Sequence, residues 1–270
     1  MHVKRHLSPQ SQPRELIYSL ISNDITNIKV FSCRNAGEAK AIKARQQLIC
    51  FVKNNDELVE YLREHGWLKS ERVTRAFKSV DRALFVPPSL KQYAYEDMPL
   101  PILRDQTISQ PLIVAVALEA LDVFPGMRVL EVGAGSGYQA ALLSEILGKN
   151  GVLYSVERLQ ELCEYARERL ARFSNIVVVH GDGSKGLPDK APFDRIIVTA
   201  GCPKIPKPLV EQLKPDGKMI APVEAVFGQE LLLIEKGSDG SGRVESQSLL
   251  PVAFVPLIGE HGFNEKQFVE

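Results

Sequence analysis

The sequence predicts an α/β fold in which a doubly wound, mostly parallel sheet is joined by an N-terminal helical subdomain and antiparallel C-terminal strands. Between residues 127 and 223, short apolar runs alternate with segments of helical periodicity, a pattern typical of parallel sheets covered on both faces. The last apolar runs are instead separated only by the turn GSDGSG at 237–242, which favours a hairpin.

Composition limits the class of protein. The 270 residues are 44% hydrophobic and 24% charged, which suits a globular chain with a substantial core. No apolar run approaches the roughly 18 residues of a membrane span, and residues 1–15 lack the apolar stretch of a secretory signal. We therefore expect a cytoplasmic monomer without membrane partners. The cysteines lack disulfide or metal-ligand spacing, so no metal is expected; they are Cys33, Cys50, Cys163 and Cys202.

Residues 1–55 form a basic extension with nine Lys or Arg against three Asp or Glu. Such an arm can attract nucleic acid, but few aromatic residues are interleaved with its charges. We favour a poorly ordered extension and leave nucleic acid open as an improbable partner. We expect the extension at 1–55 to be followed by a helical and loop subdomain on the acceptor side at 56–112, a core at 113–262 and a tail at 263–270.

The subdomain begins with two expected helices. Asp56 is a candidate N-cap for the helix DELVEYLREH, which Gly66 ends. Ser70 is a candidate N-cap for a second helix, whose apolar face stops before the prolines of FVPP. Residues 91–111 read as irregular, and Pro111 opens the apolar helix LIVAVALEAL.

The core elements follow from the alternation. Strands are expected at MRVLEV, VLYSVE, NIVVVHGD, FDRIIVTAG, GKMIAPV, ELLLIEK and within VESQSLLPVAFVPL, and helices at YQAALLSEILG, RLQELCEYARERLARF and PKPLVEQLK.

A glycine-rich loop follows the first core strand. Gly133, Gly135 and Gly137 let the backbone turn tightly and approach a ligand closely. A dinucleotide fingerprint would need a third glycine three residues after Gly135, where the chain has Tyr138. The spacing therefore argues against a bound pyrophosphate.

Acidic residues stand at the ends of the strands. Glu157 ends the second strand, where a carboxylate can accept both ribose hydroxyls. Asp182 ends the third strand and can meet an adenine amino group, for which Gly183 leaves room, and Glu131 places a carboxylate near the loop. Acids attract a cationic ligand and repel phosphate. An adenosine with a positive tail and no phosphate describes S-adenosyl-L-methionine, so the fold predicted is the class I (Rossmann-like) fold of methyltransferases dependent on it.

Several motifs resemble one methyltransferase family. They are V80–R82–F85–V86–P87, AYED at 94–97, QTISQP at 106–111, VLEVGAGSGYQAALL at 129–143, VVHGDGSKGLP, APFDRIIVTA and FVPLIG. From about residue 56 to about residue 262 the chain is similar to the protein-L-isoaspartate (D-aspartate) O-methyltransferases, and QTISQP is that family's own mark.

The resemblance implies a reaction and its residues. A methyl group passes from S-adenosyl-L-methionine to the free α-carboxylate of isoaspartyl residues in damaged proteins and peptides, which starts repair through a succinimide. Ser109 is the implied catalytic residue, which orients the acceptor and contacts the cofactor, and Thr107 is a second contact to cofactor and acceptor. Without the resemblance, Ser109 could instead cap the helix that begins at Pro111. Gln229 is implied to contact the cofactor. Val223 is expected beside the acceptor. Thr199, at the end of the fourth core strand, either borders the acceptor or has only a role in the turn there.

Three departures from the family's pattern fall on the acceptor side. Asp81 and Ala83 stand where Pro and Glu are usual, the usually glycine-rich segment before QTIS contains Arg104 and Asp105, and Glu224 stands where glycine is usual. Two alternatives accordingly stay open. One is a methyltransferase for RNA or a small molecule on the same fold, and the other is a non-catalytic protein that binds S-adenosylmethionine.

Overall fold

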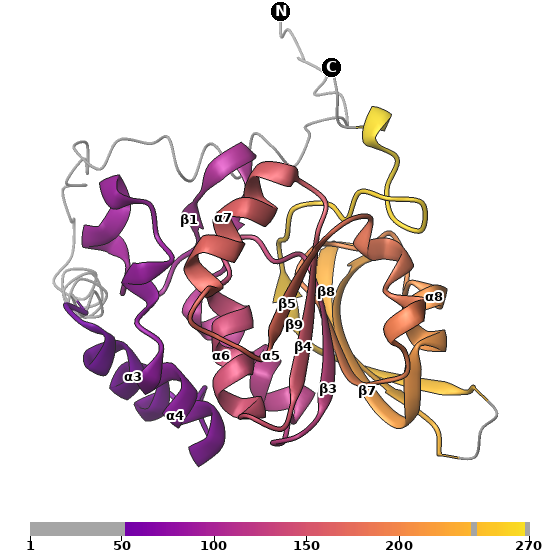
Figure 1. Ribbon diagram of the computed structural model, residues 1–270, viewed down its shortest axis with the longest axis horizontal. Coiled ribbons are helices and arrows are strands. Elements are labelled where there is room, and N and C mark those ends of the chain that lie inside the picture. The colour runs from indigo at the N-terminus through magenta and orange to yellow at the C-terminus, as the bar shows by residue number, and fades with distance from the viewer. Residues whose placement is uncertain (1–51, 239–241, 268–270) are drawn as a thin grey trace, which may run out of the picture. The chain divides into compact units, whose positions relative to one another are not determined.

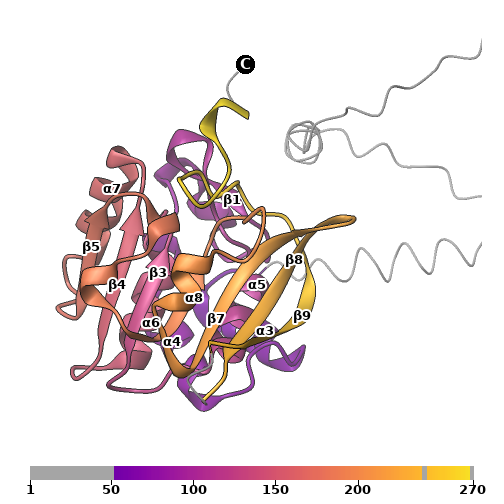
Figure 2. The ribbon, with the colours of Figure 1, turned by 90° about the vertical axis from the view of Figure 1, so that its right-hand side faces the viewer.

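The computed structural model describes residues 52–238 and 242–267, and the expectations for residues 1–51 lie outside them. A seven-stranded sheet has the order β5-β4-β3-β6-β7-β8-β9 (Figure 2). Pairing is parallel from β5 to β7 and antiparallel between β7, β8 and β9, as predicted. The strands are β3 (Arg128–Val132), β4 (Val152–Glu157), β5 (Ile176–His180), β6 (Phe193–Val198), β7 (Leu213–Ala225), β8 (Gly228–Lys236) and β9 (Val244–Val252).

Helices cover both faces of this sheet. Figure 1 shows α5, α6 and α7 on one face and α8 on the other, with α3 and α4 packed outside the first layer. The α-helices are α3 (Asn55–Glu64), α4 (Glu71–Ser79), α5 (Pro111–Leu121), α6 (Tyr138–Leu147), α7 (Gln160–Leu170) and α8 (Lys207–Glu211). Among the described residues, no helix has the length and apolar character required to cross a membrane.

The remaining elements are short. A two-stranded antiparallel ribbon pairs β1 (Leu100–Pro101) with β2 (Thr107–Ile108), inside the segment expected to be irregular. Two-residue strands are too short to show any alternation in the sequence. Single 3₁₀ turns occupy Arg82–Leu84, Pro88–Tyr93, Leu103–Asp105, Gly183–Lys185, Pro188–Lys190 and Glu265–Gln267.

The core has one layer on each face of the sheet. Val129 and Leu130 are neighbours in β3, both are 0% exposed, and they belong to different buried clusters. This follows from strand geometry, because successive side chains point to opposite faces. Leu58 of α3 shares the larger cluster with Leu142 of α6, so the first helices are part of the same core as the sheet.

Helix caps test the local predictions. Ser70 caps α4 as expected, since its hydroxyl accepts a hydrogen bond from the Val73 amide. The predicted Asp56 cap of α3 is wrong, because Asn54 is the cap and its Oδ1 accepts from the Glu57 amide at 2.9 Å. Asp56 instead lies in the first turn, where a negative charge favours the helix dipole.

Candidate active site

The order of the strands sets the position of the site. From β3 the chain runs outward to β4 and β5 and then returns to β6 on the other side of β3. Because these strands are parallel, their carboxyl ends share one edge, and ligands of such sheets bind where the strand order reverses. The glycine loop after β3, Glu157 at the end of β4 and Thr199 after β6 all fall at this edge.

The glycine loop needs its glycines for conformation and for close contacts. Gly133, Gly135 and Gly137 have φ values of 97°, 52° and 86°, in the region that side chains disfavour. A Cβ on Gly133 would also lie 2.2 Å from Thr199 Oγ1. The side chain of Thr199, the residue after β6, therefore packs directly against the loop.

Glu157 is tied to that loop. Its Oε2 accepts a hydrogen bond from the Gly135 amide at 3.0 Å, and its Oε1 accepts from the Leu159 amide at 3.0 Å. The residue is 7% exposed. Each carboxylate oxygen has a further lone pair, so ribose hydroxyls can be accepted at the place that the sequence predicts.

Glu131 is directed into the fold and is 0% exposed. The Ser155 hydroxyl donates to its Oε2 at 2.5 Å, and Gln139 Nε2 donates to its Oε1 at 3.3 Å. Burial raises the pKa of this carboxyl to about 8, although the two hydrogen bonds oppose the shift. The carboxyl is therefore enclosed by protein atoms, one of them the Gln139 amide, and the predicted contact between Glu131 and the cofactor stays a prediction.

Asp182 connects the end of β5 to the C-terminal segment. Its Oδ1 accepts from the amide and hydroxyl of Ser184, and its Oδ2 accepts from the Glu260 amide at 2.9 Å. Burial alone would raise the pKa of Asp182, but these hydrogen bonds and the charge of Lys185 lower it, so the group is ionised at neutral pH. A Cβ on Gly183 would lie 2.6 Å from Val132. Close packing against Val132 therefore requires glycine at this position, in addition to the predicted need for space for the adenine ring.

A buried arginine organises the acceptor side. Arg82 is 0% exposed and donates to the carbonyl oxygens of Ala94 at 2.9 Å, Met98 at 3.1 Å and Ser109 at 3.2 Å. Its guanidinium also lies 5.6 Å from the ring centroid of Tyr138, the first residue of α6. One side chain thereby joins the segment that carries Ser109 to the end of the glycine loop.

The hydroxyl of Ser109 does not cap α5. Asp97 takes that place, since its Oδ1 accepts from the Leu112 amide at 2.8 Å and its Oδ2 from Gln110 Nε2 at 3.1 Å. The structural alternative for Ser109, a cap of the helix at Pro111, is therefore wrong. Within residues 52–238 and 242–267, the Ser109 hydroxyl makes no hydrogen bond, and it lines a small hollow.

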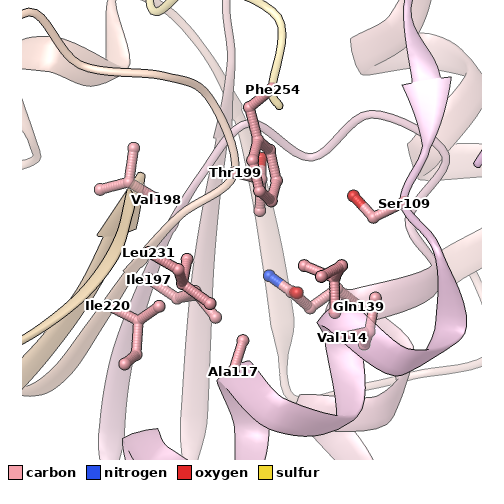
Figure 3. Close-up of a pocket in the computed structure, with 11 residues that line it drawn as sticks. Ser109, Val114, Ala117, Gln139, Ile197, Val198, Thr199, Ile220, Leu231 and Phe254 are labelled. Carbon is pink, nitrogen blue, oxygen red and sulfur yellow. The ribbon is translucent and has the colours of Figure 1, made fainter. Parts of the chain in front are cut away.

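That hollow lies between α5 and the end of β6 (Figure 3). Its walls are mostly apolar, and three polar side chains line it, from Ser109, Gln139 and Thr199. Thr199 lines this hollow, and its predicted place beside the acceptor stays a prediction. The apolar lining residues are Ile113, Val114, Ala117, Ile197, Val198, Ile220, Leu231 and Phe254.

Gln229 holds one wall of the hollow. Its Oε1 accepts from the Phe254 amide at 2.7 Å, and its Nε2 donates to the Phe254 carbonyl at 3.3 Å and to Glu224 at 2.9 Å. The predicted cofactor contact of Gln229 stays a prediction. Val223 is 8% exposed and packs in the second core cluster with Cys202, and its predicted place beside the acceptor stays a prediction.

The departures from the family's pattern have local explanations. Arg104 and Asp105 have φ values of 58° and 55°, which explains why glycine is usual in this segment. Asp81 caps the first 3₁₀ turn through the Ala83 amide at 2.9 Å and accepts from the Tyr95 hydroxyl at 3.0 Å.

Sequence reasoning missed the roles of Arg82, Gln139 and Phe254. Arg82 belongs to the V80–R82–F85–V86–P87 motif, but a charged residue in an apolar segment between a helix and a turn is a weak signal of burial. Gln139 follows the glycine loop by two residues, which was the available signal for a side chain near the site. Phe254 gave none, because its contact to Gln229 spans 25 residues.

The mostly parallel sheet, the glycine loop after its first core strand and the acid that ends the next strand together define a class I, Rossmann-like methyltransferase dependent on S-adenosylmethionine. The sequence profile of the protein-L-isoaspartate(D-aspartate) O-methyltransferase family matches residues 53–262. This chain belongs to that family, which confirms the resemblance.

Relatives and solved structures agree. The protein-L-isoaspartate O-methyltransferase of Pyrococcus horikoshii is 55% identical over 210 residues, covering 77% of this chain and 94% of the relative. That of Aeropyrum pernix is 54% identical over 211 residues, covering 77% and 80%. A solved protein-L-isoaspartate O-methyltransferase has a TM-score of 0.69 at 32% identity, covering 77% of this chain and 67% of that one. A Plasmodium falciparum structure bearing the same enzyme name, in complex with S-adenosyl-L-homocysteine, has a TM-score of 0.67 at 27% identity and covers 76% and 99%.

Proposed function

We propose that this protein methylates the free α-carboxylate of L-isoaspartyl residues in damaged proteins and peptides, with S-adenosyl-L-methionine as methyl donor. The observation that carries the proposal is the hydroxyl of Ser109, which is free to donate and lines the hollow at the end of β6 in a member of this family. Methoxide leaves an ester more readily than oxide leaves a free carboxylate, so the neighbouring peptide nitrogen attacks the ester carbonyl, methanol is lost and the succinimide re-forms. Hydrolysis then opens part of the succinimide to normal aspartate.

The residues present fit the cofactor. The positive-φ loop gives a close backbone approach without side chains, and the carboxylates of Glu157 and Asp182 can accept from ribose hydroxyls and an adenine amino group. Thr107 is a further proposed contact. S-adenosyl-L-methionine supplies an electrophilic methyl group carried by a positive sulfonium. The acids of the site suit that positive charge.

The protein's contribution to the reaction is positioning. A carboxyl group of this kind has a pKa of about 4 and is already ionised at neutral pH, so a general base is not required. Ser109 donates a hydrogen bond to one acceptor oxygen and orients it for in-line attack. Correct placement of the reacting atoms contributes several kcal/mol, on the order of 7–11 in the best cases. The apolar lining of the hollow keeps water from solvating the acceptor oxygen.

The acceptor class distinguishes this proposal from its alternatives. Family membership favours isoaspartyl proteins and peptides over RNA or a small molecule, and the free Ser109 hydroxyl favours a catalyst over a protein that only binds cofactor. The cytoplasmic location and the monomeric state stay predictions.

The test uses paired peptides. The purified full chain is incubated with labelled S-adenosyl-L-methionine and with peptides that differ only in an isoaspartyl or aspartyl linkage, and base-labile methyl ester is counted. We expect labelling of the isoaspartyl peptide alone and a loss of about 10- to 100-fold in kcat/KM for Ser109→Ala, which removes one hydrogen bond to a charged group. Equal labelling of both peptides would refute the proposed acceptor, and full activity of Ser109→Ala would refute the role of that hydroxyl.

A further inference from the structure

The acceptor carboxylate needs more than one hydrogen-bond donor. A carboxylate has two oxygens with about four lone-pair sites, and in a mostly apolar hollow an unpaired oxygen is costly. Three polar side chains line the hollow, and one of them is Thr199. The single hydroxyl hydrogen of Thr199 is already donated to main-chain carbonyls, because its Oγ1 lies 2.7 Å from the Gly133 oxygen and 3.0 Å from the Val132 oxygen. Ser109 and Gln139 are left.

Gln139 is held rigidly. It is the second residue of α6, so its backbone is set by the helix that follows the glycine loop. One amide hydrogen of Nε2 is given to Glu131 Oε1 at 3.3 Å, and Glu131 is itself held by the Ser155 hydroxyl at 2.5 Å. An amide nitrogen carries two hydrogens, and no second acceptor for Nε2 is present among the described residues.

The side chain is also directed to the right place. Gln139 is half-buried, and Figure 3 shows its amide and the Ser109 hydroxyl directed toward the same space beneath Phe254. The two donors come from different elements, α6 and the end of β2, so together they can hold an oxygen pair from two sides. Hydrogen bonds made in a low-dielectric hollow are stronger than in water.

We propose that Gln139 donates the second hydrogen bond to the acceptor carboxylate, with Ser109 as the first donor and the Ser155–Glu131 pair fixing the amide. The proposal rests on the proposed function and adds a residue to its acceptor site. The methionine end of the cofactor also carries a carboxylate, so the experiment must separate the two sources of this group.

The experiment compares Gln139→Met with Gln160→Met. Methionine keeps the length of the side chain and removes both donors. Gln160 is also in the first turn of a helix, α7, but it is exposed and bonded to Glu164 outside the hollow. The measurements are KM and kcat for an isoaspartyl peptide, and calorimetric binding of S-adenosyl-L-homocysteine.

For Gln139→Met we expect KM for the peptide to rise about 10- to 100-fold, as for loss of a hydrogen bond to a charged group. S-adenosyl-L-homocysteine should bind within about twofold of wild type, and Gln160→Met should match wild type in both. In the double variant Gln139→Met and Ser109→Ala, kcat/KM should fall by less than the product of the two single-variant factors, because the two donors share one carboxylate.

Two results would overturn the proposal: an unchanged KM, or weaker S-adenosyl-L-homocysteine binding by the same factor as KM, which assigns the amide to the cofactor. If circular dichroism shows that Gln139→Met does not fold, Gln139→Asn gives the same test, since its amide is one methylene too short and should raise KM similarly. If wild-type protein binds S-adenosyl-L-homocysteine but does not methylate the isoaspartyl peptide, the proposed function fails, and this inference with it.

Discussion

Replacing Arg82 by methionine should loosen the segment that carries Ser109 and destabilise the fold. The guanidinium is 0% exposed and donates to the carbonyls of Ala94, Met98 and Ser109. Methionine fills similar space with no donor. Three carbonyl oxygens in a part-buried region then lose the guanidinium that donates to them. The Ser109 backbone also loses its connection, through Arg82, to Tyr138 of α6.

The magnitude follows from two opposing effects. Each stranded acceptor costs about 1–3 kcal/mol. Burial lowers the pKa of Arg82 from 12.5 to about 10, which corresponds to about 3 kcal/mol of unfavourable charge burial that methionine relieves. A net destabilisation of about 2–5 kcal/mol is expected, consistent with the cost of breaking a buried charged network.

Two assays check this expectation. Urea unfolding gives the free energy of unfolding, and methylation of an isoaspartyl peptide gives kcat/KM, which should fall about 10- to 100-fold as Ser109 shifts by a fraction of an ångström. Arg82→Lys is the matched control, because it retains the charge, can satisfy fewer carbonyls and should be intermediate in both assays. If Arg82→Met unfolds within about 0.5 kcal/mol of wild type, or keeps full kcat/KM, the anchoring role of Arg82 is wrong.

Three further changes have defined outcomes. Gly133→Ala places a Cβ at φ 97° and 2.2 Å from Thr199 Oγ1, so unfolding experiments should show a loss of about 2–4 kcal/mol; an unchanged midpoint would contradict the close contact. Arg104→Gly removes a side chain from a residue with a φ of 58°, so the free energy of unfolding should rise by about 0.5–1 kcal/mol. A fall in that free energy would contradict backbone strain at Arg104. The Glu131 carboxyl, with a pKa of about 8 in the fold against an ordinary 4.5, holds an extra proton in the folded state between those values. Stability should therefore fall as pH rises from 4.5 to 8, by up to about 5 kcal/mol, and Glu131→Gln should flatten that dependence in unfolding curves taken across the range.

Most of the fold could be predicted because its signals are local. Buried parallel strands produce apolar runs, helices produce a 3.6-residue period, and the Ser70 cap stands directly before its helix. The Asn54 cap was missed for a physical reason. Both Asn54 and Asp56 can accept from a first-turn amide, and the extended backbone of Asn54, with φ −151° and ψ 171°, decides between them.

The site divides along the same line. The glycine loop and Glu157 were predicted because each stands at a strand end, where chain order and sheet geometry coincide. Glu131 lies two residues before the glycine loop, but its side chain is buried in the core. Successive side chains of a strand point to opposite faces of the sheet, and the local sequence does not show which face is buried. Asp182 was found at its strand end, but its contacts to the 259–261 segment join residues 78 apart in the chain.

By itself, the sequence determined the class of fold, the glycine loop after the first core strand and, through QTISQP, the family to which the chain belongs. Only the tertiary structure decided which polar groups form hydrogen bonds within the protein and which can still bond to a ligand. The Thr199 hydroxyl donates to the Gly133 carbonyl in the loop after β3. Asp97 caps α5, so the Ser109 hydroxyl is not needed there. Gln139 uses one of its two amide hydrogens to bond Glu131, and the other is available. The reason is that hydrogen bonds saturate: whether a side chain is available depends on partners that folding brings from distant parts of the chain.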